Sequence, residues 1–203
     1  MKFSHTKLEQ IRHNPENIKQ IVSDGRGSFS KNSAWKFSIK KYHQNNSNKD
    51  FAFKYFEEMF ERNFVDNNAN RLIKVELLEK LERYIEDYEK LKFEFYDYSN
   101  RISIDIKHGN MISGEIFRFD KTQDGFAVTL FHNDESIWIK ELRYPLLQIY
   151  FSNRFNCPAE LIKVGVYNFI DEIHEYNTFD ELTLHQSWEE VTKLSNEINK
   201  VVL

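Results

Sequence analysis

Carboxylates and one lysine near the ends of predicted strands are the residues in this sequence that could do chemistry. Glu115 lies in an apolar stretch, Glu141 opens a later helical segment with Lys140 beside it, and Asp134 and Glu135 follow the strand between them. Carboxylates brought together hold a divalent metal ion, and a lysine can orient or activate the attacking water. Because charged residues beside turns are common, a hydrolytic site built from Glu115, Lys140 and Glu141 is one hypothesis among several.

Other catalytic chemistries leave no signature in the sequence. A lone cysteine, Cys157, excludes an internal disulfide and a cysteine-ligated zinc or iron–sulfur site, which needs a cluster of cysteines. His5 and His13 are eight positions apart and His174 and His185 are eleven apart, and neither spacing is typical of a helical ligand pair. No phosphate-binding glycine loop and no nucleophile elbow is present. We therefore expect no bound metal and no cofactor.

The positive charge is concentrated at the beginning of the chain. Residues 1–49 contain ten Lys and Arg against three Asp and Glu, a local charge of +7, which leaves the other 154 residues at −11. Such a basic segment can contact phosphates, and aromatic rings beside the lysines can stack on bases. Solvated faces of helices explain the same lysines without any ligand. The residues expected to bind nucleic acid are Arg26, Lys31, Trp35, Lys36, Lys40 and Lys41.

Helical spacing of apolar residues dominates the first third of the chain. Ser4 can cap a short helix and Pro15 can open a second one. An aromatic stripe at helical spacing runs from Trp35 to Phe64 and pauses in a polar segment. Residues 1–66 are thus predicted to form a helical N-terminal part, and a longer helix is predicted over 67–88.

The periodicity then changes from helical to alternating. Residues 91–131 predict a meander of about four antiparallel strands joined by tight turns. They are followed by a helix over 140–155, a strand over 161–169 that is apolar on both faces, and a final helix capped by Asp180. This order predicts an α/β fold with a mixed central sheet, against which the helices over 67–88 and 140–155 pack.

Length and composition favour a single globular domain over the whole of residues 1–203. The chain is 40% hydrophobic and 30% charged, and 18 Phe and 10 Tyr stand against 6 Gly and 3 Pro, which is the reverse of a disordered composition. No stretch has the length and hydrophobicity of a signal peptide or a membrane span. We expect a cytoplasmic protein with no membrane partner.

Several strings resemble the RecB-like branch of the PD-(D/E)XK nucleases, in the order in which that family has them. The segment 112–120 resembles the family's GxIDRID strand and matches it at Gly114, Ile116, Arg118 and Asp120. The opening segment 3–15, the helix 142–151 with Gln148 and the strand 162–169 also resemble family elements, so the likeness covers nearly the full chain. The resemblance implies a restriction-endonuclease-like fold, with residues 67–203 as its nuclease-like core.

The sequence departs from the family at the residues that perform the chemistry. Phe117 stands at the carboxylate position of the GxIDRID-like string, and Leu130 and His132 stand where the next strand should have Asp and Lys. Gln148 is followed by Ser152 where the family has tyrosine. The family's metal site is therefore missing, and Asp120, Gln148 and the displaced acidic residues are weak catalytic candidates.

The resemblance and its departures leave three hypotheses for function. The first is a catalytically degenerate nuclease-like domain that binds nucleic acid, a protein partner or both, as part of a DNA-processing or phage-defence complex. The second is an active nuclease with migrated ligands, which alone would require magnesium or manganese. The third is a structural interaction subunit without a nucleic-acid role.

Overall fold

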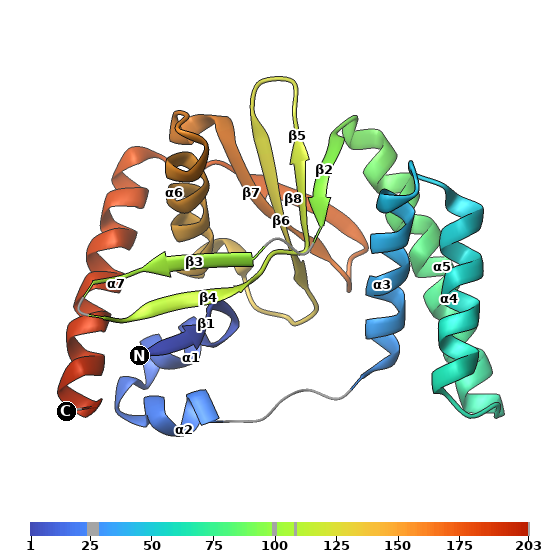
Figure 1. Cartoon of the computed structure of the whole chain (residues 1–203), viewed down its shortest axis with the longest axis horizontal. Coiled ribbons are helices and arrows are strands. Elements are labelled where there is room, and N and C mark those ends of the chain that lie inside the picture. The colour runs from blue at the N-terminus through green and yellow to red at the C-terminus, as the bar shows by residue number, and fades with distance from the viewer. Residues whose placement is uncertain (24–28, 99–100, 108, 203) are drawn as a thin grey trace. The chain divides into compact units, whose positions relative to one another are not determined.

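A computed structural model describes residues 1–23, 29–98, 101–107 and 109–202 of the chain (Figure 1). The chain divides into two compact units. Residues 1–25, 94–170 and 174–203 form the first, which we call the α/β unit, and residues 26–93 with 171–173 form the second, which we call the helical unit. The mixed α/β class with a helical N-terminal part is thus confirmed.

The α/β unit contains two mixed sheets. The smaller has the strand order β1-β4-β3, with β1 parallel and β3 antiparallel to β4. The larger has the order β2-β5-β6-β7-β8, in which β5 is antiparallel to both of its neighbours and β6 is parallel to β7. The strands are β1 (Lys2–Ser4), β2 (Glu94–Tyr98), β3 (Arg101–Asp105), β4 (Met111–Glu115), β5 (Arg118–Lys121), β6 (Phe126–His132), β7 (Ile162–Asn168) and β8 (Ile173–Asn177).

Short polar side chains cap the beginning of η1 and of α7 in this unit. Ser4 accepts from the Thr6 amide at the first turn, and Asp180 accepts from the Thr183 amide at 2.7 Å before the last helix. The α-helices are α1 (Leu8–His13), α2 (Ile18–Ser23), α6 (Arg143–Phe155) and α7 (Glu181–Val202), and 3-10 turns occupy η1 (His5–Lys7), η2 (Pro15–Asn17), η3 (Trp138–Lys140) and η4 (Ala159–Leu161).

Helix α6 is the crossover between the parallel strands β6 and β7, and it packs against β7 and α7. Leu146, Leu147 and Phe151 of α6 are buried with Val164 and Val166 of β7. The prediction of a buried strand over 161–169 is confirmed, since most of β7 is inaccessible to solvent on both faces.

The helical unit consists of α3 (Lys31–Gln44), α4 (Lys49–Asn63) and α5 (Asn68–Leu91), capped by Ser30, Asn48 and Asn67 respectively. Aromatic rings fill its interior, as the stripe in the sequence predicts. Trp35 meets Tyr84 edge-on with ring centres 5.6 Å apart, and Phe56 and Phe60 are buried on α4. Glu172 belongs to this unit, where it forms ion pairs with Lys80 (2.7 Å) and Arg83.

Three sequence-based expectations about the architecture need correction. The segment 91–131 is not one meander, because β2 pairs with β5 while β3 and β4 form a hairpin in the other sheet. The helix over 67–88 was expected on the sheet, whereas α5 belongs to the helical unit and packs against α3 and α4. The short strands β1 and β8 were not foreseen. The single domain over 1–203, divided after residue 66, stays a prediction.

Among the described residues, no helix combines the length and the hydrophobicity that a membrane crossing requires.

Candidate functional site

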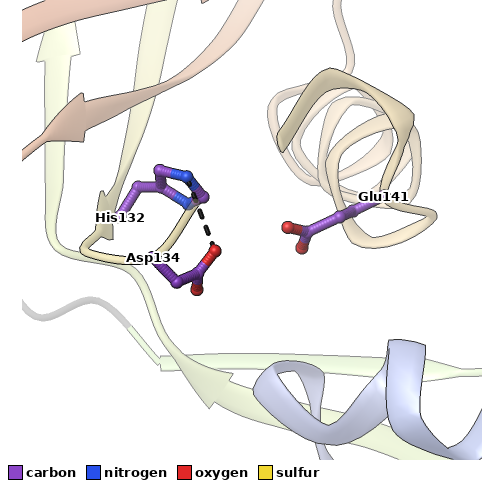
Figure 2. A group of neighbouring side chains, drawn as sticks. All are labelled: His132, Asp134 and Glu141. Carbon is purple, nitrogen blue, oxygen red and sulfur yellow. Dashed lines mark ion pairs between the residues drawn. The ribbon is translucent and has the colours of Figure 1, made fainter. Parts of the chain in front are cut away.

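A group of polar side chains gathers in the α/β unit where β6 ends and α6 begins (Figure 2). His132 is the last residue of β6, Asp134 lies in the following loop, and Glu141 precedes the first turn of α6. One potential ligand atom from each of the three lies within 4.8 Å of the other two. We call these three residues the β6–α6 cluster.

Local hydrogen bonds through Ser136 hold the cluster together. The Ser136 amide donates to Asp134 Oδ1 at 2.9 Å, and its hydroxyl donates to Glu141 Oε1 at 2.7 Å. Hydrogen bonding from Ser136 lowers the pKa of Asp134 below its ordinary value. His132 is buried, and its Nε2 lies 3.1 Å from the Ser136 carbonyl oxygen. Because a carbonyl only accepts, Nε2 of this imidazole carries a proton.

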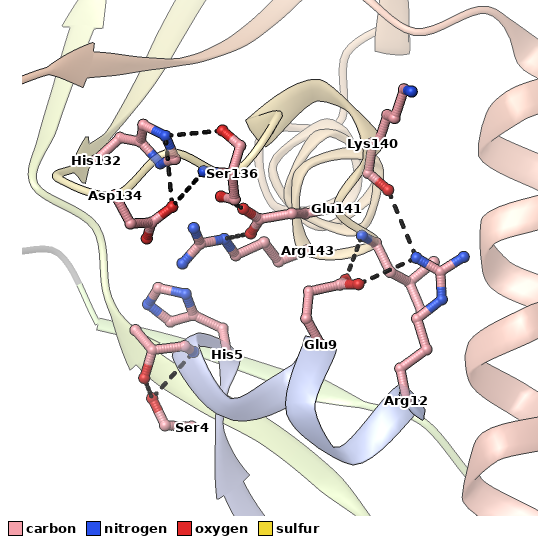
Figure 3. A network of polar contacts seen from close by, with 12 residues as sticks. Ser4, His5, Glu9, Arg12, His132, Asp134, Ser136, Lys140, Glu141 and Arg143 are labelled. Carbon is pink, nitrogen blue, oxygen red and sulfur yellow. Dashed lines mark hydrogen bonds and ion pairs between the residues drawn. The ribbon is translucent and has the colours of Figure 1, made fainter. Parts of the chain in front are cut away.

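Arg143 supplies a positive charge to the cluster. Its Nε lies 2.6 Å from Glu141 Oε2, and the two side chains are only 10% and 13% exposed. Figure 3 shows the guanidinium between Asp134 and His5. With two carboxylates and one guanidinium, the group has a formal charge of −1 when both imidazoles are neutral.

His5 of η1 faces the cluster from the N-terminal segment (Figure 3). Its ring is 5% exposed, and its Nε2 donates to the Glu115 carbonyl at 3.1 Å. Burial, reinforced by the charge of Arg143, lowers its pKa to about 4. Gly114 makes room for the ring, because a Cβ at that position would lie 2.2 Å from His5 Cδ2.

Helix α1 is attached to the start of α6 and to α7, and Figure 3 shows its Glu9 and Arg12 beside Lys140. Glu9 accepts from the Leu142 amide at 2.6 Å and pairs with Arg12 at 3.1 Å. Arg12 in turn donates to both oxygens of Glu190, at 2.6 and 3.0 Å. These contacts fix η1 and α1, and with them His5, relative to the start of α6.

The structure does not gather the residues of the predicted migrated site. Glu141 is in the cluster, but Glu115 is exposed and pairs with Arg101 at 3.4 Å. The side chain of Lys140 points away from the cluster in Figure 3. Glu115 and Lys140 are thus not part of the β6–α6 cluster, and a catalytic role for Glu115, Lys140 and Glu141 stays a prediction.

Asp120 and Gln148 have structural partners instead of a place in the cluster. Gln148 is buried, donates to the carbonyls of Ala159 and Phe179 at 3.0 Å, and accepts from the Phe179 amide at 2.8 Å. Its amide thus ties α6 to the segment before α7. Asp120 is fully buried and pairs with the equally buried Arg118 at 2.7 Å.

Arg118 is the centre of a buried polar network on β5 and its neighbours. Besides Asp120, its guanidinium contacts the Tyr176 hydroxyl at 2.9 Å, His174 Nε2 at 3.0 Å and the Thr129 hydroxyl at 3.4 Å. Thr129 and Tyr176 also bond to each other at 2.8 Å. We call these five residues the Arg118 network.

Phe117 and Leu130 are both buried, as the sequence predicts for positions that lack the family's carboxylates. The Phe117 ring contacts Tyr98 and Phe131, with ring centres 5.2 and 5.8 Å apart. Apolar side chains therefore occupy the two positions where the resemblance would require oxygen ligands.

The expected nucleic-acid-binding residues fall mainly on α3 of the helical unit. Lys31, Lys36, Lys40 and Lys41 are partly exposed there, while Arg26 lies outside the described residues. Trp35 is fully buried, so the expectation that this ring is available for stacking is wrong. Helical spacing turns Trp35 toward the core and turns the neighbouring Phe37, which is 44% exposed, outward.

Sequence reasoning missed the parts of the site that depend on packing. Asp134 and Glu141 were among the carboxylates considered, but not their combination with His132. His5 was dismissed because its spacing to His13 suggested no pair, although its tertiary neighbours come from β4 and α6. The sequence did indicate that Phe37 shares a helix face with Lys40 and Lys41, because it is three and four positions from them.

Comparisons with known proteins leave the family open. No protein-family model and no curated protein matches the chain. A solved structure described as "Crystal structure of SSO0001" is similar with a TM-score of 0.28 and 11% identity, over 93% of this chain and 87% of that one. A similarity this low supports no argument about function.

Proposed function

We propose that this chain binds single-stranded nucleic acid through α3 of the helical unit and does not cleave it. The observation that carries the proposal is the composition of α3, which has four lysines, no carboxylate, and an exposed phenylalanine on its outer face. Proteins that bind single strands combine positive charge for the backbone with aromatic rings on which bases stack.

Further aromatic residues extend this surface. Phe29, 42% exposed, stacks on Phe37 with ring centres 6.2 Å apart. On the neighbouring helix, Tyr55 lies under the Lys41 ammonium at 5.7 Å and stacks with the exposed Phe51 at 6.5 Å. Aromatic rings of α4 therefore lie beside Lys41 of α3.

The absence of cleavage is supported by the α/β unit. Magnesium requires close to six oxygen ligands, which the buried Phe117 and Leu130 do not provide. Membership of a DNA-processing or phage-defence complex remains part of the proposal, and it rests on the sequence resemblance alone.

Fluorescence anisotropy with labelled single-stranded DNA, single-stranded RNA and duplex DNA over a range of salt concentrations tests the binding. Neutralising Lys36, Lys40 and Lys41 to glutamine should reduce the salt slope by about two units, or 0.7 for each phosphate contact on a single strand. Phe37→Ala should weaken binding by about 1–3 kcal/mol and leave the slope unchanged. Equal affinity in all of these variants would contradict the proposal.

Two controls accompany the measurement. Lys193→Gln removes an exposed lysine of α7 in the α/β unit, and Leu72→Ala removes an exposed apolar side chain of α5, and neither should change affinity appreciably. Incubation of the same substrates with magnesium or manganese should give no products. Cleavage that is lost in Glu115→Ala would instead support the hypothesis of an active nuclease.

Lys36 allows a further test by pH. Burial lowers its pKa to about 8, so it is charged at pH 7 and largely neutral at pH 9. Wild-type binding should therefore weaken as pH rises through 8, and Lys36→Arg should remove this part of the pH dependence. The same loss of affinity in the arginine variant would show that Lys36 makes no phosphate contact.

A protein partner is the second candidate, and exposed apolar residues of the helical unit favour it. Val65, Leu72 and Val75 are 77%, 73% and 55% exposed. Light scattering over a range of concentrations would detect self-association. A Leu72→Lys variant that dissociates such an oligomer would assign it to α5.

A further inference from the structure

We propose that the β6–α6 cluster binds a divalent transition-metal ion of the zinc type through His132, Asp134 and Glu141. This site lies in the α/β unit and is independent of the nucleic-acid surface proposed for α3. It also differs from the magnesium site of the family, whose carboxylate positions are occupied by Phe117 and Leu130.

The donor set decides the class of metal. One imidazole and two carboxylates are ligands typical of zinc sites, whereas magnesium is bound almost entirely by oxygen. Ligand atoms within 4.8 Å of one another require only a small contraction to surround one ion. Three protein ligands would leave a fourth position open to water.

A second, independent observation concerns two buried imidazoles whose Nδ1 atoms have no hydrogen-bond partner among the described residues. Nε2 of His132 faces the Ser136 carbonyl and Nε2 of His5 faces the Glu115 carbonyl, at 3.1 Å in both cases. Nε2 of each ring therefore carries a proton, and a neutral ring then has its lone pair on Nδ1. Among the described residues neither Nδ1 has a hydrogen-bond partner, although the two residues are 2% and 5% exposed.

This arrangement is the one that metal sites use. A metal-ligating histidine commonly donates its second ring nitrogen to a backbone carbonyl, which fixes the tautomer and the ring orientation. In His132, Nε2 faces the Ser136 carbonyl and also lies 3.7 Å from Asp134 Oδ1. Coordination through Nδ1 would keep the bond to the carbonyl, and coordination through Nε2 would replace it. His5, which faces the cluster in Figure 3, offers its bare Nδ1 as an acceptor for a water molecule bound to the ion.

Ser136 and Arg143 fix the orientation of the Glu141 carboxylate. They bind different oxygens of its carboxylate, Oε1 at 2.7 Å and Oε2 at 2.6 Å. The guanidinium also opposes a second cation, but two carboxylates leave the group at −1, so a divalent ion is still attracted. Replacing Arg143 by glutamine should consequently tighten metal binding.

The proposal is tested on the untagged full-length chain, stripped of metal, by titration with zinc against a chromophoric zinc indicator. One zinc ion should bind per chain, and cobalt in its place should give the visible absorption of a coordinated ion. His132→Ala, Asp134→Asn and Glu141→Gln should each weaken zinc binding at least tenfold. Magnesium should compete poorly.

Matched variants outside the cluster distinguish zinc bound at the cluster from zinc bound adventitiously elsewhere. His185→Ala removes an exposed histidine and Glu135→Gln an exposed acid next to Asp134, and neither should alter the affinity. Circular dichroism identifies any variant that fails to fold, and the cobalt spectrum of the wild type needs no variant at all. Zinc binding that is insensitive to the three ligand changes, or a cobalt spectrum equal to that of the aqueous ion, would overturn the proposal.

Discussion

The α/β unit contains two charged groups that differ in how fully their polar atoms are satisfied. In the Arg118 network, a fully buried guanidinium is matched by a carboxylate, two hydroxyls and an imidazole. In the β6–α6 cluster and the adjoining His5, two buried imidazole nitrogens are bare and Asp134 is 61% exposed. Complete satisfaction is typical of a structural network, whereas a buried polar atom without a protein partner can accept a hydrogen bond from a water molecule or bind an ion.

The comparison predicts that the largest loss of stability comes from breaking the Arg118 network. Arg118→Met should lower the free energy of unfolding by about 3–5 kcal/mol, because it leaves the fully buried Asp120 without its counter-ion. Urea denaturation monitored by circular dichroism measures the change.

Two further variants sharpen this first prediction. Adding Asp120→Leu to Arg118→Met should restore most of the stability, since no uncompensated charge then remains. Arg101→Ala, which breaks the exposed pair with Glu115, should cost at most about 1 kcal/mol. A loss as small for Arg118→Met as for Arg101→Ala would remove the distinction between the two groups.

The second prediction concerns the pH dependence of stability that His5 confers. Its pKa in the folded state is about 4, below the ordinary value of 6.5, so folding favours the neutral ring. The stability from this group is complete above pH 6.5 and is lost as pH falls toward 4, on the order of 3 kcal/mol.

His5→Gln retains an amide donor for the Glu115 carbonyl but does not titrate. The free energy of unfolding of this variant should therefore change less between pH 7 and pH 4 than that of the wild type. Parallel pH profiles for the two proteins would show that His5 is not buried as a neutral imidazole.

The third prediction tests the close contact that seats His5 beside the cluster. Gly114 has a φ of 155°, and its missing side chain leaves space for the His5 ring. Gly114→Ala should destabilise the protein by about 1–3 kcal/mol through overpacking. In a double-mutant cycle, His5→Ala should recover part of this loss, whereas strictly additive effects would argue against the contact.

The smallest effect is expected at Asp134. Asp134→Asn should change stability by less than about 1 kcal/mol, because the side chain is mostly exposed and an asparagine can still accept from the Ser136 amide. The same change should weaken the proposed zinc binding at least tenfold. A large loss of stability on this substitution would instead give Asp134 a structural role.

The sequence predicted the features that local interactions determine and missed those that depend on contacts between distant segments. The segments 140–155 and 161–169 were predicted closely, because apolar periodicity and local turns set their type. The pairing of β2 with β5 and the attachment of α5 to α3 and α4 were not, because pairing depends on contacts between segments distant in the chain. Apolar side chains at every second position indicate a strand, but they do not show which strand it pairs with.

For the candidate site, the sequence by itself determined which groups were available and which were missing. It identified Asp134 and Glu141 as carboxylates near strand and helix ends, and it placed apolar residues at positions 117 and 130. Only the tertiary structure decided that the side chains of Glu115 and Lys140 stay outside the cluster that contains Glu141, that Trp35 turns inward, and that His5 faces residues more than a hundred positions away. Residue type fixes what a side chain can do, but the packing of distant segments fixes its neighbours, its burial and therefore its charge state.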